Sequence, residues 1–107
     1  MRGHLDVMLL AVLGAGPAHG YAIIEELRGR SDGVFTLPEG TVYPALHRLE
    51  QEGLLSSGWA DGSGRRRRVY ELTRRGRARL GARRRAWTDF AAAVNAVLED
   101  PSCATTA

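Results

Sequence analysis

The sequence of 107 residues predicts a mainly α-helical fold that contains one small β-hairpin. Three observations support this prediction. Apolar residues recur at helical spacing in the first half of the chain and again toward its end, the period changes to two between residues 55 and 72, and stretches rich in glycine and proline separate the segments. The length and the 44% hydrophobic content are typical of one globular unit with a modest core.

The first two predicted helices cover residues 5–13 and 21–30. On the first, one helical face carries the apolar residues Leu5, Met8, Leu9, Val12 and Leu13, and the GAGP stretch at 14–17 ends the helix. On the second, we expect Tyr21, Ile24 and Leu27 to lie on one side and the charged residues largely on the other. A short segment rich in breakers, 31–40, then leads to a third helix.

The third predicted helix lies within residues 37–55. Thr41 is expected to be its N-cap, because the hydroxyl can accept a hydrogen bond from a free amide of the first turn. Pro44 would then fall near the third helical position, where no intrahelical donor is lost. Gly53 can supply the left-handed residue that ends the helix. One apolar stripe, formed by Val42, Leu46 and Leu49, is expected to face the core.

The opposite face of this helix carries side chains that can donate hydrogen bonds or stack: Tyr43, His47, Arg48 and Gln51. The unpaired N–H groups at its N-terminus favour phosphate. Such a face suits a nucleic-acid groove, and the alternative is an ordinary amphipathic surface helix.

The hairpin follows, with alternating residues in 55–59 and 68–72 on either side of a predicted turn at Asp61–Gly64. Four arginines, Arg65–Arg68, stand at the start of its second strand beside the glycine-rich tip. A hairpin with a basic tip after three helices is the wing of a winged helix-turn-helix, where the tip reaches the DNA backbone while the third helix enters the major groove. Trp59 can instead pack under the hairpin, and an arginine run by itself can be a solvated face.

The last predicted helix runs from Arg74 to Leu98, capped by Thr73, and at about 37 Å it is longer than so small a domain can cover. Its apolar stripe is the predicted dimer interface and consists of Trp87, Phe90, Ala91, Val94, Val97 and Leu98. This stripe is expected to pack on the same helix of a second copy of the chain. The alternative is that it packs on the first helix of its own chain. The predicted organisation is a DNA-binding domain at 1–73, a dimerisation helix at 74–99 and a flexible tail at 100–107.

Charge is distributed unevenly along the chain. Between residues 65 and 85 there are eleven arginines and one acidic residue, whereas the remainder holds four arginines and eleven acidic residues. A basic block beside an acidic remainder is an electrostatic footprint for a polyanion. The apolar runs are too short to span a bilayer, and the N-terminus has no signal-peptide cleavage site. We therefore expect a cytoplasmic protein that does not bind a membrane.

Enzymatic and metal-binding classes find no support in the sequence. There is no G-x-S-x-G, no Walker loop and no pair of carboxylates in an obvious cleft, so neither catalysis nor a cofactor is predicted. The three histidines fall on different elements without a cysteine or carboxylate grouping, and the single Cys103 cannot form an internal disulfide.

Several short motifs follow one another along the chain: His19-Gly20-Tyr21, the run GTVYPAL at 40–46 with Leu49-Glu50, the run GLL at 53–55, and Tyr70-x-Leu72-Thr73 with Gly76. Together they resemble the PadR family of winged-helix transcriptional regulators over roughly residues 5–98. The resemblance implies a homodimeric repressor that binds an inverted repeat near its own or a neighbouring promoter and is often released by a small molecule. With one helix after the wing, the chain is similar to the short members of the family.

The resemblance also bears on two regions of the chain. In some short members, aromatic residues on the dimer helices line a pore for planar hydrophobic compounds, and Trp87 and Phe90 lie in the corresponding region. These two residues are equally consistent with a dry dimer interface. The chain departs from the family around Ser57-Gly58-Trp59, and its four consecutive arginines suggest wing contacts that are more electrostatic than usual.

Nine residues are the predicted DNA contacts: Tyr21, Thr41, Tyr43, His47, Arg48, Arg65, Arg66, Arg67 and Arg68. His47 and Arg48 are expected to reach base edges, and the wing arginines to neutralise phosphate or enter the minor groove. Tyr43 has a competing interpretation as a half-buried residue of the core. Two other functions stay open, an adaptor whose wing binds an acidic protein and a constitutive DNA-binding protein without an inducer.

Overall fold

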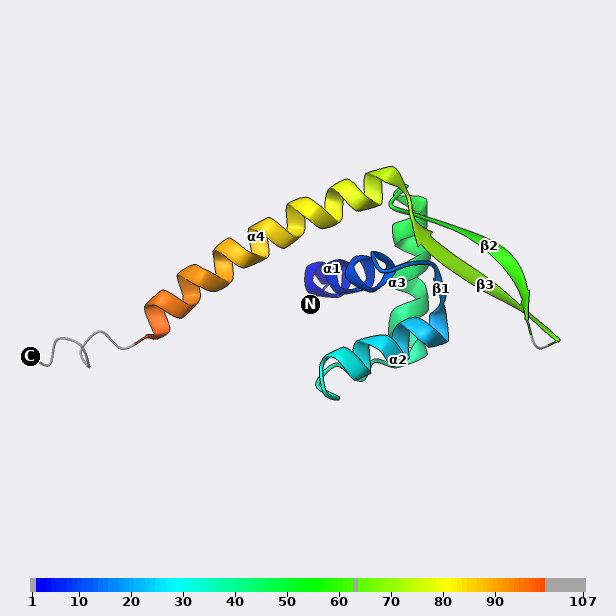
Figure 1. The fold of residues 1–107 in the computed structure, drawn as a ribbon, viewed down its shortest axis with the longest axis horizontal. Coiled ribbons are helices and arrows are strands. Elements are labelled where there is room, and N and C mark those ends of the chain that lie inside the picture. The colour runs from blue at the N-terminus through cyan, green and yellow to red at the C-terminus, as the bar shows by residue number, and fades with distance from the viewer. Residues whose placement is uncertain (1, 63, 100–107) are drawn as a thin grey trace, which may run out of the picture.

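The computed structural model describes residues 2–62 and 64–99. The elements, in chain order, are α1 (Arg2–Leu13), β1 (Ala18–His19), α2 (Gly20–Arg30), α3 (Glu39–Gln51), β2 (Leu55–Gly62), β3 (Arg65–Leu72) and α4 (Arg74–Leu98). Figure 1 shows α1, α2 and α3 gathered beside the base of the β2–β3 hairpin, with α4 leading away from it. The predicted mainly helical fold with a hairpin is confirmed, and the predicted tail at 100–107 lies outside the described residues.

The core forms where the apolar faces of the three N-terminal helices meet. Leu9 of α1, Ile23 of α2, and Val42, Leu46 and Leu49 of α3 are all fully buried, so the predicted stripe on the third helix is confirmed. On α2 the prediction was wrong for one residue, because Ile23 rather than Tyr21 joins Ile24 and Leu27 in the core. Tyr21 is 58% exposed.

The hairpin belongs to an antiparallel sheet of three strands in the order β1-β3-β2, where sequence analysis expected two strands. The short β1 pairs Ala18 with Tyr70 and His19 with Val69, which ties the start of α2 to the wing. The β2–β3 ladder continues to Gly62 opposite Arg65. The predicted turn at Asp61–Gly64 is therefore too long, since Asp61 and Gly62 are strand residues.

The start of α3 also differs from the prediction. The helix begins at Glu39 with extended Pro38 in the N-cap position, and no side chain caps it. The carbonyl of Pro38 accepts hydrogen bonds from the amides of Thr41 and Val42, so Thr41 is the third helical residue and not the cap. Pro44 consequently lies inside the helix, where its ring takes the place of a donor to the carbonyl four residues earlier. At the other end Gly53, with φ of 81°, takes the predicted left-handed conformation.

The last helix has the predicted bounds and the predicted cap. The Thr73 hydroxyl accepts a hydrogen bond from the Gly76 amide at 3.0 Å and donates one to the Gly53 carbonyl at 2.7 Å. The first half of α4 packs on α1 through buried Leu80, and Arg83 donates to the carbonyl of Gly3 at 2.9 Å. The second half extends beyond the core (Figure 1), in a molecule of 67 × 28 × 21 Å. Within the described residues, no helix is long and apolar enough to cross a membrane.

Candidate nucleic-acid interface

A basic hollow lies where the N-terminus of α2, the N-terminal half of α3 and strand β3 come together. Its volume is about 530 Å³. The residues that line it are His19, Gly20, Tyr21, Glu39, Tyr43, Arg66, Arg67 and Arg68. Five of the predicted DNA contacts thus share one site, and three of these five are arginines of the wing.

The three residues of the His19-Gly20-Tyr21 motif have separate structural roles at the edge of this hollow. The Nδ1 atom of His19 caps α2 by accepting a hydrogen bond from the amide of Ala22 at 3.2 Å. Gly20 is buried against the Tyr43 ring, which a Cβ atom at that position would overlap. Tyr21 points outward and is largely exposed. The motif therefore begins α2 while leaving space for the aromatic ring of α3.

Tyr43 combines the two interpretations that the sequence left open. It is half-buried and packs against the hydrophobic core, and it also lines the hollow. A side chain held in this way keeps one fixed position, because the core and Gly20 restrict its ring. It is placed to contact a ligand only through the part that faces the hollow.

The exposed face of α3 is formed by Gly40, Thr41, Pro44, His47 and Gln51. Thr41 and His47, two of the predicted DNA contacts, are thus exposed on this face. Gln51 lies one turn further along that face, and its amide can donate to and accept from a base edge. Sequence reasoning placed Gln51 on this face without including it among the contacts. The helical spacing of residues 40, 44, 47 and 51 is the signal that identifies it.

Arg48 requires a correction, because its guanidinium is bound to α1 and does not lie open to a groove. It donates two hydrogen bonds to the Asp6 carboxylate, at 2.9 and 2.7 Å, and Glu52 lies 3.8 Å away. The hydrogen bonds to Asp6 raise the pKa of Arg48 above its ordinary value. Its side chain is 25% exposed. The expectation that Arg48 reaches base edges therefore does not fit this structure, in which Arg48 joins α3 to α1.

A double-mutant cycle measures this link. We expect Arg48→Met and Asp6→Asn each to lower the free energy of unfolding, with a coupling of about 1 kcal/mol, since a bidentate, partly buried pair exceeds a fully exposed one. Urea unfolding of the two single variants and the double variant gives the coupling. If Arg48→Met reduced discrimination between DNA sequences while leaving stability unchanged, Arg48 would have to leave Asp6 on binding.

The wing arginines differ in how firmly other residues hold them. Arg68 donates from Nε to the Ser57 hydroxyl at 3.0 Å and lies 3.9 Å from Glu50. The guanidinium groups of Arg66 and Arg68 lie 4.9 and 5.2 Å from the ring centre of Trp59. Trp59 is 57% exposed on the hairpin surface, so the alternative in which it packs underneath is wrong. The side chain of Arg65 lies outside the described residues.

Arg67 is the wing arginine that turns toward α2. Its Nη1 atom lies 2.8 Å from Nε2 of His19. The side chain therefore crosses from β3 to the N-terminus of α2, at the place where β1 and β3 pair. Sequence reasoning assigned no role to His19 in this contact, since nothing in the spacing of two residues 48 positions apart indicates it.

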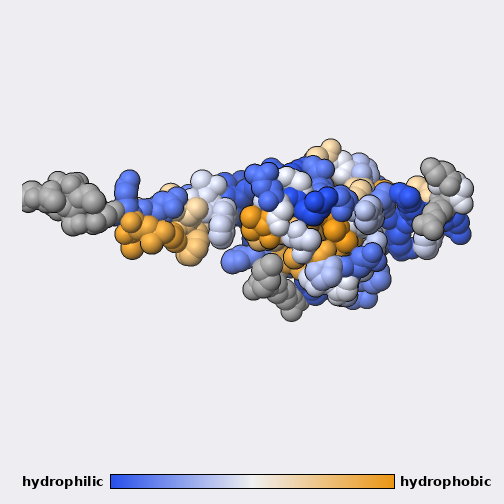
Figure 2. All heavy atoms as spheres, turned by 90° about the horizontal axis from the view of Figure 1, so that it is seen from below, coloured by the Kyte–Doolittle hydropathy of each residue, from blue (hydrophilic) through white to orange (hydrophobic). Residues whose placement is uncertain are grey.

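The predicted dimer residues line the far half of α4. Trp87 and Phe90 are half-exposed, with ring centres 5.8 Å apart, and the His4 ring meets Trp87 edge-on at 5.5 Å. Ala91 and Val94 are partly buried, while Val97 and Leu98 are 79% and 73% exposed. Figure 2 shows the resulting hydrophobic surface at the α4 end of the molecule. The described part of one chain thus leaves most of this stripe exposed.

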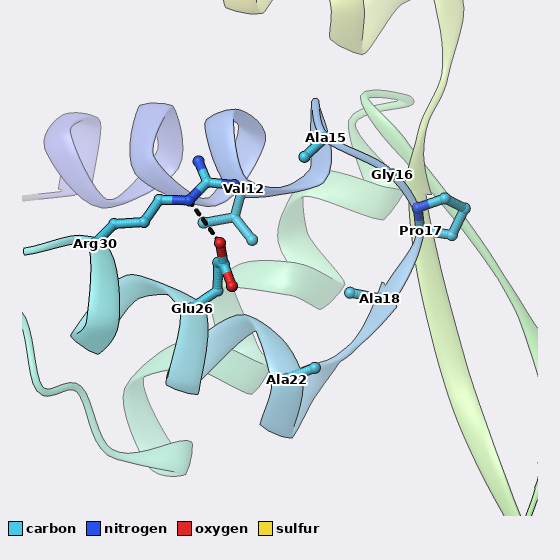
Figure 3. Close-up of a pocket in the computed structure, with 8 residues that line it drawn as sticks. All are labelled: Val12, Ala15, Gly16, Pro17, Ala18, Ala22, Glu26 and Arg30. Atoms are coloured by element: carbon cyan, nitrogen blue, oxygen red, sulfur yellow. Dashed lines mark hydrogen bonds and ion pairs between the residues drawn. The ribbon is translucent and has the colours of Figure 1, made fainter.

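A second hollow of about 220 Å³ lies between the end of α1 and α2 (Figure 3). Its wall consists mainly of small side chains, and an ion pair between Glu26 and Arg30, at 2.8 Å, stands beside Val12. The two charged side chains of this lining are paired with each other, so the hollow is a weaker candidate for a ligand site than the basic one. Among residues 2–62 and 64–99, no group of three or more His, Cys, Asp or Glu side chains is placed to hold a metal ion.

Comparison with known proteins relates this geometry to transcriptional regulators. The profile of the transcriptional regulator PadR-like family matches residues 9–82. A transcriptional regulator of Mycobacterium tuberculosis is 44% identical over 73 residues, covering 68% of this chain and 65% of that protein. A PadR family transcription regulator from Clostridium difficile has a TM-score of 0.81 at 32% identity, covering 89% of this chain and 98% of that one. A PadR family regulator from Eggerthella lenta has a TM-score of 0.77 at 34% identity, with 92% and 84% covered.

Proposed function

Since this chain belongs to the PadR-like family of transcriptional regulators, which are not enzymes, we propose that it is a homodimeric repressor that binds an inverted-repeat DNA operator in the cytoplasm. The observation that supports this most is the basic hollow, in which three wing arginines lie together with Tyr21 of α2 and Tyr43 of α3. The operator would lie near its own gene or a neighbouring one. A small hydrophobic effector would release the repressor.

The exposed face of α3 and the basic hollow have different roles in the proposed DNA binding, the first in contacting bases and the second in contacting phosphates. Thr41, His47 and Gln51 present hydroxyl, imidazole and amide groups that suit base edges in the major groove. Arg66 and Arg67 have the charge and reach to contact the phosphate backbone, which contributes affinity but little sequence information. Tyr21 is placed to contact a phosphate at the edge of the hollow.

A mobility-shift assay tests the proposal. The probe is DNA from upstream of the protein's own gene, with unrelated DNA as competitor at physiological salt. A shift that resists competition is expected. Equal competition by unrelated DNA, combined with binding to an acidic protein, would favour the adaptor function. The shift repeated with candidate effectors separates an inducible repressor from a constitutive DNA-binding protein.

The uncovered stripe on α4 supports the proposed dimer. Phe90, Val97 and Leu98 expose large apolar side chains along a helix that extends past its own core. Pairing of two such helices about a two-fold axis would cover both stripes and would place the two copies of α3 near one DNA turn apart, roughly 34 Å.

We expect Phe90→Glu to convert the dimer to a monomer, because a charge would be buried in the paired stripe. Ala96→Glu is the matched control, since it adds the same charge to an exposed position on the opposite face of α4. Size-exclusion chromatography with light scattering measures the mass of each variant. If both variants remained dimers, another surface would have to join the protomers.

The proposed effector site lies between the aromatic pairs of the two protomers, at Trp87 and Phe90. Half-exposed rings in contact with each other suit a planar aromatic compound if they do not close on each other in the dimer. Titration of the Trp59→Phe variant with planar aromatic compounds isolates the Trp87 fluorescence. Saturable quenching together with release of DNA supports the site, and no quenching by any compound supports a dry interface.

A further inference from the structure

The His19 ring cannot accept hydrogen bonds from both of the donors that lie beside it. The imidazole ring has two hydrogen-bond donors beside it, the amide of Ala22 at Nδ1 and the guanidinium of Arg67 at Nε2, at 3.2 and 2.8 Å. A neutral imidazole has one acceptor nitrogen, and its other nitrogen carries a hydrogen. One of the two contacts therefore brings two donors together.

The cap of α2 is the contact that the ring is expected to keep. The first amides of a helix have no partner within the helix, and the His19 ring satisfies one of them. With Nδ1 as the acceptor, the hydrogen of the ring is at Nε2 and points toward Arg67. Two N–H groups, one from α2 and one from the wing, then converge on the same point at the edge of the basic hollow.

The surroundings favour an anion at this point. Arg66 and Arg68 line the same hollow, as do the aromatic residues Tyr21 and Tyr43. Glu39 is the one acidic residue of this lining, and Asp61 lines a smaller hollow that His19 and Arg67 also border. Across residues 2–62 and 64–99 no carboxylate is in ion-pair contact with Arg67. The pair of donors thus has positive neighbours, and the described part of the chain provides no carboxylate as their shared acceptor.

We propose that His19 and Arg67 both donate to one oxygen of a DNA backbone phosphate, which makes His19 a phosphate-binding residue that joins the wing to α2 when DNA is bound. This inference rests on the proposed DNA binding. Two nitrogens that share one acceptor oxygen lie roughly 4–5 Å apart, so Arg67 would move outward by about 1–2 Å to admit it. The phosphate would supply the acceptor that the free protein lacks, and the cap of α2 would stay in place.

A double-mutant cycle on DNA binding tests the pair. His19→Ser keeps an N-cap acceptor for α2 but removes the second donor, and Arg67→Ala removes the guanidinium donor; we call the pair His19 and Arg67 the clamp. Because a phosphate contact does not depend on sequence, the probe is an arbitrary duplex of about 30 base pairs at low salt. We expect each variant to weaken binding by roughly tenfold and the double variant to lose little more than Arg67→Ala alone.

Control variants separate the clamp from general effects. His47→Ser makes the same substitution on the exposed face of α3, and its effect should multiply with that of Arg67→Ala. His19→Asn is a second cap-preserving variant, used if His19→Ser loses more than a few degrees in melting temperature. Independent, multiplying effects of His19 and Arg67 would overturn the clamp. Failure of the unsubstituted protein to bind any duplex would overturn the proposed function as well.

The ring nitrogens of His19 give a second measurement, because their signals would not change on DNA binding if His19 only capped α2. Nitrogen-15 shifts of the ring in the DNA complex should show hydrogen at Nε2 and none at Nδ1, with a change at Nε2 on binding. Hydrogen at Nδ1 in the complex would overturn the proposal, because the ring would then have given up the cap of α2. An unchanged Nε2 signal on binding would overturn it too.

Discussion

Replacing Arg66 and Arg67 together with alanine is expected to weaken binding to every DNA sequence by about 10²- to 10³-fold at physiological salt. Both arginines line the basic hollow, and within residues 2–62 and 64–99 neither has a carboxylate partner such as Glu50, which lies 3.9 Å from Arg68. A dimer would lose four phosphate contacts. Each contact releases counterions from DNA, so its removal costs affinity whatever the bases are.

The salt dependence gives the sharper measurement. If the dimer neutralises about six phosphates, log K against log salt should have a slope near −5, and the double variant should bring this to about −1 to −2. Fluorescence anisotropy with one duplex at several salt concentrations gives both slopes. A slope near zero for the unsubstituted protein would contradict the electrostatic account.

A matched control tests whether position or only net charge matters. Arg77→Ala with Arg84→Ala removes the same charge from exposed positions on α4, outside the basic hollow. We expect this variant to keep nearly the full slope. If the wing variant kept its slope and lost only discrimination between sequences, the roles assigned to the wing and to α3 would have to be exchanged.

Elements with local signals were predictable from the sequence. The bounds of α4 follow from a capping threonine and an apolar stripe, and the end of α3 follows from Gly53, because caps and breakers act within a few residues. The stripe of α3 was predictable for the same reason. Each of these features depends on residues separated by one or two helical turns.

Features that depend on distant residues were not predictable in this way. Arg48 and Asp6 are 42 positions apart, and helical spacing alone places Arg48 near the face of His47. The two-residue β1 is too short to show an alternating sequence pattern. It is a strand because it pairs with the edge of β3. Thr41 was an attractive cap by residue type, but the helix begins three residues earlier, because Pro38 occupies the N-cap position and its carbonyl accepts the first hydrogen bonds. For Arg48 and β1 a tertiary contact decides the outcome, whereas at the start of α3 a local backbone hydrogen bond does.

Gly76→Ala is expected to lower the free energy of unfolding by about 3–5 kcal/mol, a large share of the stability of a small domain. Gly76 is buried in the first turn of α4, and a Cβ atom there would overlap the carbonyl oxygen of Leu54. That carbonyl also accepts a hydrogen bond from the Thr73 amide at 3.1 Å. The backbone cannot move away without breaking this bond and shifting the cap that Thr73 provides for Gly76.

Gly81→Ala, in the same helix, is expected instead to raise the free energy of unfolding. A Cβ atom there would meet only Arg85 Nη1, at 3.7 Å, an ordinary van der Waals distance. Alanine in place of a helical glycine then raises stability by about 0.5–1 kcal/mol, because it reduces the freedom of the unfolded chain. Urea unfolding at one fixed protomer concentration compares the two variants without a change in any dimer equilibrium. A Gly76→Ala variant as stable as the Gly81→Ala variant would mean that α4 can move away from Leu54, and that glycine is not required for the close approach of these two backbones.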